Sequence, residues 1–326
     1  MSSRQQILRF EPGTSHVDTR RVPRLNVATA IGALVVVFGA VWLAFQLVTN
    51  PGFEWDVVGE YMLNPHILNG AWITILLTAL TMVFGTILGI ILAVMRLSGN
   101  AVLVVTSSAF VWFFRSTPAL VQLIFWYNLA SLFPIFGLGV PFGGPKFLEL
   151  DTNMLITSFT AALLGLGLNE AAYMAEIVRG GILSVDPGQK EAAMALGMKP
   201  RRTLLRIILP QAMRAIIPPT GNQVIGMLKY TSLASVVALG ELLSAAQDIY
   251  NRTYQIIPLL IVASIWYLIM TTVLSAIQSK IEQHYSRGDR QVQTSAITES
   301  IRTVATRVRG QRAAAATSRR GREGAR

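Results

Sequence analysis

Long runs of apolar residues constrain this chain more than any other feature of its sequence. The stretch 27–48 contains no charged residue, and comparable runs recur to about residue 279. A membrane-spanning helix needs about 20 consecutive, mostly apolar residues. Only 14% of the residues are charged, against about 25% in typical soluble domains. Because short alternating segments of the β-barrel type do not dominate, the sequence predicts an all-α, polytopic membrane protein.

The apolar runs predict about six spans. They cover 27–48, 71–97, 117–136, 153–184, 220–243 and 256–279. With this count, the segments rich in Lys and Arg all fall on one side of the membrane, as the positive-inside rule requires. We therefore expect a multi-pass membrane protein with both termini in the cytoplasm.

The two ends of the chain are polar and basic. Residues 1–26 form an expected cytoplasmic N-terminal segment, and residues 288–326 form an Arg- and Ala-rich cytoplasmic tail. The tail has too little apolar area to offset the entropy of ordering, so we expect it to be disordered, with anionic lipid headgroups as possible contacts. The net charge of +11 does not indicate nucleic acid, since aromatic residues do not alternate with the basic ones.

Several kinds of chemistry are not expected from this composition. The chain has no cysteine, and its three histidines, His16, His66 and His284, are far apart, so no metal site is predicted. No nucleophile-base pair is recognisable. No Gly-x-x-x-x-Gly-Lys-Ser/Thr loop occurs either, so this chain is not expected to bind or hydrolyse ATP by that route. We predict a non-enzymatic protein without a cofactor.

The segment between the fourth and fifth predicted spans carries the most informative motif. It reads EAAMALGMKPRRTLLRIILP from Glu191 to Pro210. Ser184 or Asp186 can cap a helix there, and Pro187 suits its first position. The alanines favour a helix, and Gly197 can end it in a left-handed conformation. We expect a short, stiff helix whose small side chains let another protein approach closely.

This motif resembles the EAA signature loop of permeases in ATP-binding-cassette (ABC) importers. Further stretches look like the branch that takes up polar amino acids such as histidine, glutamate, glutamine and arginine. They are 69–75 (NGAWITI), 115–118 (RSTP), 169–181 (NEAAYMAEIVRGG) and 229–233 (KYTSL). The resemblance covers about 69–286, with a coupling loop at 185–210. It leaves 27–48 as an extra transmembrane helix outside the family core.

The resemblance implies a type I ABC importer permease of the bacterial plasma (inner) membrane that translocates a polar amino acid by alternating access. Its partners would be a separate ATPase that binds ATP, an external or periplasmic amino-acid-binding protein, and a second permease subunit, identical or similar. The residues expected to couple to the ATPase are Glu191, Ala192, Ala193, Gly197 and Pro210. The alternative is a secondary, ion-coupled amino-acid transporter, which would need ion sites and usually repeated spans.

Charged residues inside predicted spans indicate where substrate passes, because burying charge in a membrane is costly. Glu170 and Lys229 are expected at similar depth, either paired or facing an amino-acid zwitterion. A structural ion pair or a lysine reaching the interface is the alternative. The expected substrate pathway consists of Glu170, Lys229, Asn169, Thr231 and Ser232. Glu176 and Arg179 are interpreted as a structural pair, and Gly85 and Gly89 as possible helix-packing positions.

Overall fold

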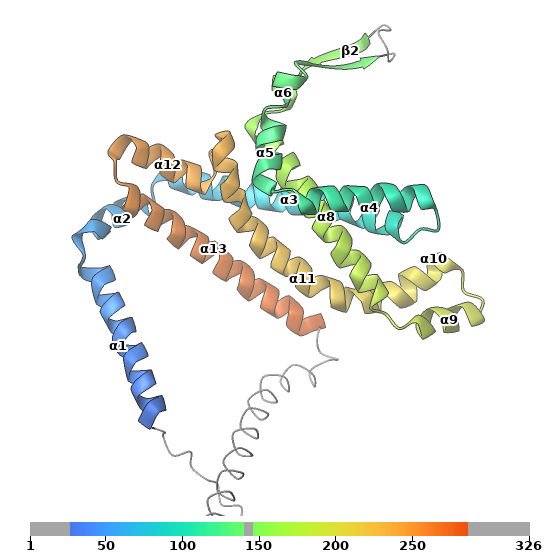
Figure 1. Ribbon diagram of the computed structural model, residues 1–326, viewed down its shortest axis with the longest axis horizontal. Coiled ribbons are helices and arrows are strands. Elements are labelled where there is room, and N and C mark those ends of the chain that lie inside the picture. The colour runs from blue at the N-terminus through green and yellow to red at the C-terminus, as the bar shows by residue number, and fades with distance from the viewer. Residues whose placement is uncertain (1–26, 140–145, 286–326) are drawn as a thin grey trace, which may run out of the picture. The chain divides into compact units, whose positions relative to one another are not determined.

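The computed structural model describes residues 27–139 and 146–285, most of which are helical (Figure 1). Two compact units are distinguished, Met1–Phe53 and Glu54–Arg326. The predicted N-terminal segment 1–26 and the basic tail 288–326 lie outside the described residues.

The first unit contains one long helix. This helix, α1, spans Val27–Thr49 and is followed by the 3-10 turn η1 at Pro51–Phe53. It coincides with the first predicted span, and its described side chains are exposed. A surface that is apolar all round suits contact with lipid rather than with water.

The second unit contains the remaining elements. They are α2 (Trp55–Tyr61), α3 (Pro65–Arg96), α4 (Ala101–Ser116), α5 (Ala119–Tyr127), α6 (Leu129–Leu132), β1 (Ile135–Gly139), β2 (Lys146–Asp151), α7 (Thr152–Leu155), α8 (Ser158–Leu183), α9 (Pro187–Ala195), α10 (Pro200–Thr203), the π-helical segment η2 (Leu204–Ile208), α11 (Leu209–Tyr230), the 3-10 segment η3 (Thr231–Val237), α12 (Leu242–Thr253) and α13 (Ile256–Tyr285). Among the described residues, four helices can each cross a membrane, and two bent helix pairs raise the number to as many as six.

The third predicted span, 117–136, is wrong as a continuous helix. Within these residues the chain forms α5 and α6 and then enters β1. Helix α4 ends just before the predicted span, and its axis differs from that of α5 by 100°. The break follows from Pro118, because a proline disfavours helical conformation at the residue before it. Thr117 is accordingly extended, with φ −106° and ψ 142°. Beyond α6, the end of this predicted span and the residues before the next one pair as an antiparallel hairpin of β1 and β2.

The fifth predicted span, 220–243, is also shifted. Helix α11 begins at Leu209, with Pro210 in its first turn, and continues through Pro218 and Pro219 to Tyr230. Proline is tolerated in the first turn of a helix because the N–H groups there have no helical partner. The rest of the predicted span becomes η3, and α12 follows at an angle of 45° to the preceding segment.

Helices α3 and α8 pack closely along their length. Gly85 and Gly89 on α3 make this approach possible. A Cβ atom added at Gly89 would lie 2.6 Å from the Cβ of Met174, and one at Gly85 would lie 2.9 Å from the Cβ of Glu170. The glycine pair therefore lets α3 and α8 pack closely. This packing holds the polar residues of α8 in position.

A buried acid that the sequence analysis did not single out begins α12. Glu241 is fully buried, and one carboxylate oxygen accepts a hydrogen bond from the Ser244 amide at 2.7 Å. The other oxygen accepts from the Leu243 amide at 3.0 Å and the Tyr267 hydroxyl at 2.8 Å. Thr74 on α3 accepts from the Leu242 amide at 3.1 Å. This N-cap fixes α12 between α3 and α13 and so serves the scaffold.

Candidate functional site

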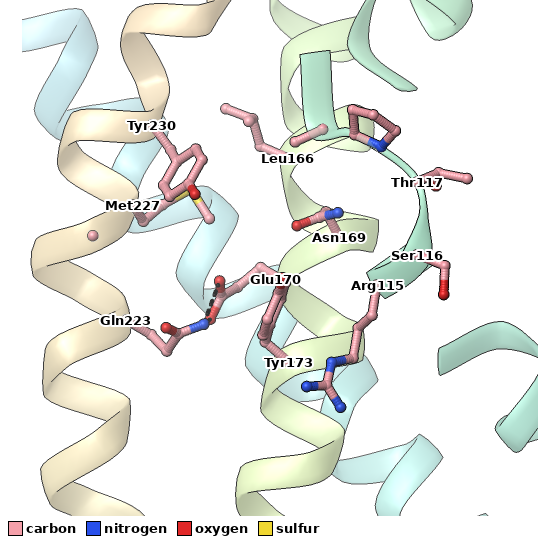
Figure 2. A pocket seen from close by; sticks show the side chains of 13 residues that line it. Arg115, Ser116, Thr117, Leu166, Asn169, Glu170, Tyr173, Gln223, Met227 and Tyr230 are labelled. Atoms are coloured by element: carbon pink, nitrogen blue, oxygen red, sulfur yellow. Dashed lines mark hydrogen bonds between the residues drawn. The ribbon is translucent and has the colours of Figure 1, made fainter. Parts of the chain in front are cut away.

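A polar cavity of about 470 Å³ lies between α8, α11 and the break that joins α4 to α5 (Figure 2). Its volume is within the range of small-molecule sites, about 300–1,000 Å³. Helix α8 contributes Asn169, Glu170 and Tyr173, and α11 contributes Gln223 and Tyr230, while Arg115 comes from the last turn of α4, next to the break. We call this space the first cavity.

The break that forms one wall of this cavity is held by a buried glutamine. The Gln122 side-chain amide on α5 donates to the Phe114 carbonyl at 3.1 Å, the Thr117 carbonyl at 3.1 Å and the Thr117 hydroxyl at 2.6 Å. These carbonyls lack helical partners where α4 ends, so the side chain takes the place of the missing backbone donors. The 100° bend is thus fixed, and it directs Arg115 toward α8 (Figure 2).

Asn169 joins the break to α8. Its amide nitrogen donates to the Phe114 carbonyl at 2.8 Å and lies 3.4 Å from the Gln122 carbonyl oxygen. The predicted pathway residue therefore lines the cavity and also uses its nitrogen to anchor the wall. Its oxygen points into the cavity (Figure 2), where it can accept a hydrogen bond from a ligand.

Glu170 supplies the negative charge of the first cavity. Its side chain is only 3% exposed, and the Gln223 amide donates to its two oxygens at 3.2 and 3.4 Å (Figure 2). Within the part of the chain that the structure describes, no Lys or Arg forms an ion pair with it. A buried carboxylate with only a neutral partner is costly, so a cationic group of a ligand would be stabilised beside Glu170.

Arg115 supplies a positive charge to the same cavity. Its guanidinium carbon lies 5.2 Å from the centre of the Tyr173 ring. Among the described residues no carboxylate is paired with this arginine. Four of the lining residues were not among those expected from the sequence, namely Arg115, Tyr173, Gln223 and Tyr230. On α11 the signal was present, because Gln223 and Tyr230 are seven residues apart and so share a helix face.

The structure does not bring Lys229 to Glu170. Lys229 is exposed and lies outside the lining of the first cavity, because it is six residues from Gln223 and off the helix face that carries the lining. Thr231 is buried and donates to the Leu228 carbonyl at 2.8 Å, and Ser232 donates to the Lys229 carbonyl at 2.7 Å. Of the predicted pathway, only Asn169 and Glu170 are brought together here.

Near the C-terminal end of α8, Glu176 forms an ion pair with Arg179 at 2.8 Å, as predicted. Glu176 also pairs with Arg96, at the end of α3. The two arginines clamp one carboxylate between neighbouring helices, a pairing the sequence could not reveal because 80 residues separate Arg96 from Glu176.

Helix α9 is the predicted motif helix. Asp186 caps it by accepting the Gly188 amide at 2.7 Å, and Pro187 is its first residue. Gly197 has φ +73°, and the amides of Gly197 and Met198 bond to the carbonyls of Met194 and Ala193. These are the bonds of a Schellman cap, so the predicted left-handed end of the helix is present.

The predicted coupling residues differ in exposure. Glu191 and Ala192 are exposed, Ala193 is buried against the protein, and Gly197 is exposed. Pro210 lies in the first turn of α11, next to Gln211, whose side-chain amide donates to the Gln189 side-chain oxygen of α9 at 3.3 Å. Met194 and Leu196 also present apolar surface, with 51% and 82% of their area exposed. Such a helix offers a surface that is free to receive a partner.

Comparison with known proteins identifies the architecture. Residues 85–287 match the family model described as the inner membrane component of binding-protein-dependent transport systems. The arginine transport system permease protein ArgU of Corynebacterium glutamicum is 42% identical, with 87% of this chain and 89% of that protein aligned. The L-cystine transport system permease protein TcyB of Bacillus subtilis is 38% identical over 74% of this chain and 95% of that protein.

A solved structure agrees with these relatives. The crystal structure of an amino acid ABC transporter with histidines contains a chain that is 33% identical, covering 70% of this chain and 98% of its own length, with a TM-score of 0.59. The expected ABC importer permease fold and the multi-pass inner-membrane location are thereby confirmed, and the secondary transporter is set aside. Members of this family work with a separate ATPase and a substrate-binding protein and are not themselves catalytic. The chain therefore belongs to the family of inner membrane components of binding-protein-dependent transport systems and is a membrane-spanning permease subunit.

Proposed function

We propose that this permease imports cationic amino acids through the first cavity and that arginine is its preferred substrate. The observation that carries the proposal is Glu170, a buried carboxylate that faces the cavity with only the Gln223 amide as its partner. A substrate with a guanidinium or ammonium group would supply the missing counter-charge. The 42% identity to an arginine permease supports the same substrate class.

The two charged residues of the cavity suit the two ends of such a substrate. Glu170 would receive the cationic side chain, and a guanidinium can bind a carboxylate through two parallel hydrogen bonds. Arg115 would receive the α-carboxylate in the same way. Tyr173 and Tyr230 line the cavity, and their ring faces attract cations, which adds to the preference for arginine or lysine.

Helix α9 would dock on the ATPase subunit that binds ATP. Glu191 and Ala192 face outward, Gly197 ends the helix, and Pro210 opens the helix that carries Gln223. Since α8 leads into α9 through only three residues, Ser184 to Asp186, a movement of α9 would be transmitted to the residues that line the cavity. Closing and opening of the ATPase would then drive alternating access.

The remaining assignments follow the family. We assign 69–286 to the transport domain, because the family match covers 85–287, with 185–210 as its coupling loop and α1 as an additional helix. A second permease subunit, identical or similar, and an amino-acid-binding protein on the outer side would complete the importer, and both termini would be cytoplasmic.

Direct binding tests the substrate class without the selectivity of the binding protein. Permease and ATPase are assembled in nanodiscs, and binding of radiolabelled arginine, lysine and glutamine is measured at equilibrium. Glu170→Gln should weaken arginine binding about tenfold or more, since a hydrogen bond to a charged group contributes about 1.5–3 kcal/mol. The control Glu60→Gln removes an exposed acid and should change nothing. Equal binding of arginine by the wild type and Glu170→Gln, or preference for glutamine, would refute a cationic substrate.

A further inference from the structure

A second polar cavity, of about 410 Å³, adjoins the first on the side of α8 that leads to α9. It is bounded by Ser108 and Trp112 of α4, Arg96 of α3 and Glu176 of α8. Three residues, Arg115, Ser116 and Tyr173, line both cavities. The two spaces are therefore neighbours with a common wall, and that wall is the contact between Arg115 and Tyr173.

One face of α8 runs through both cavities. Asn169, Tyr173 and Glu176 follow at spacings of four and three residues, so they lie above one another on the helix. At 1.5 Å per residue, Glu176 is about 9 Å further along the axis than Glu170. This separation is comparable to the length of an extended arginine. A substrate that leaves the first cavity therefore reaches the second by moving about its own length.

The charges of the second cavity suit the backbone of an amino acid. Glu176 is shared by Arg96 and Arg179, which leaves this group of three with one excess positive charge. Arg115 adds a further guanidinium that, among the described residues, is paired with no carboxylate. An excess of cations attracts a carboxylate, and Glu176 offers an acceptor to the α-ammonium group beside it.

We propose that the second cavity is an exit site for the transported amino acid, with Arg115 as the carboxylate-binding residue common to both sites. The proposal rests on the proposed function of the first cavity. Because Arg115 borders both spaces, the α-carboxylate stays bound to it while the α-ammonium group moves beside Glu176, and the cationic side chain leaves Glu170 last and passes Tyr173. The Tyr173 ring can rotate aside because its contact with Arg115 is weak. The guanidinium carbon lies 5.2 Å from the ring centre, and both side chains are exposed. The substrate charge is never left in a wholly apolar environment.

The absence of cysteine from the chain permits a direct test. Ala119 lines only the first cavity and Ser108 only the second, so Ala119→Cys and Ser108→Cys report on the two spaces separately. Both changes are small, which protects the fold. The assembled importer is treated with a neutral thiol reagent, with and without arginine, and the rate at which the permease is modified is measured.

At an arginine concentration about ten times the dissociation constant, mass action predicts that modification slows about tenfold at an occupied site. We expect arginine to slow modification at both positions, whereas glutamate slows neither. Protection of Ala119→Cys alone would overturn the exit site and leave the proposed function intact. Protection at neither position would overturn both proposals.

Discussion

Helix α9 and the first cavity obtain their geometry in different ways. The bonds that begin and end α9 lie within 13 residues, from the Asp186 cap through Pro187 to the Met198 amide at the Gly197 turn. The first cavity is assembled from α8, α11 and the break between α4 and α5, whose lining residues extend from Arg115 to Tyr230. One region is specified by local chemistry and the other by the packing of distant helices.

This difference has a consequence for how the two regions tolerate change. A helix whose capping bonds are local can be altered with little effect on the remainder of the permease. Helix α9 does touch its neighbours, since the Gln211 side-chain amide of α11 donates to the Gln189 side-chain oxygen at 3.3 Å, but its caps do not depend on that contact. The cavity has no such independence. Its wall is held by Gln122 and Asn169, which bond to the backbone of a neighbouring element, so a change at either residue is transmitted to Arg115 and to the substrate.

The largest effect is expected from Gln122→Ala. The side chain is 6% exposed and makes three donor bonds at the break. Losing them and leaving a void should cost about 2–3 kcal/mol. The thermal unfolding midpoint of the purified permease should fall, and arginine binding should weaken because Arg115 is no longer held.

Asn128→Ala is the matched control for Gln122→Ala. Asn128 caps the same helix, and its amide donates to the Ile124 carbonyl at 2.8 Å, but it is exposed. This variant should retain the wild-type unfolding midpoint and arginine affinity. If both variants behaved alike, the cavity wall would not depend on the buried glutamine, and the contrast with α9 would be lost.

A smaller and more selective effect is expected from Gly197→Val. The left-handed conformation at φ +73° costs an L-residue about 1–2 kcal/mol, so α9 would end differently. Stimulation of ATP hydrolysis by the loaded binding protein should fall about 5- to 30-fold, while arginine binding by the permease stays unchanged.

Gly197→Asn separates conformation from contact. Asparagine tolerates the left-handed region better than other residues with a side chain, so this variant should recover most of the stimulation lost in Gly197→Val. A loss as severe as that of valine would mean that the ATPase requires the absence of a side chain at this position, and that the backbone turn is not what matters.

The contrast between the two regions also explains what the sequence could predict. Capping, proline placement and the left-handed glycine are local signals, and together with the apolar runs they predicted α9 and the all-α membrane fold correctly. The early end of the third span was missed, because an apolar run does not reveal that α5 stops at Tyr127 and that β1 begins at Ile135. Lys229 was assigned to the pathway by its depth in a span, but exposure depends on which helix face meets a neighbour. Gln223 and Arg115 acquire their roles only through packing against α8.

The smallest effect tests whether α9 is specified by its own sequence. Asp186→Ala removes the acceptor of the Gly188 amide at 2.7 Å, and losing an N-cap costs about 1 kcal/mol. If α9 holds its own shape, stimulation of ATP hydrolysis should fall about fivefold, whereas Asp186→Asn, which keeps a cap acceptor, should leave it nearly unchanged. Unaltered stimulation in Asp186→Ala would instead mean that contact with the ATPase stabilises the helix start, so that α9, like the cavity, depends on a surface outside its own segment.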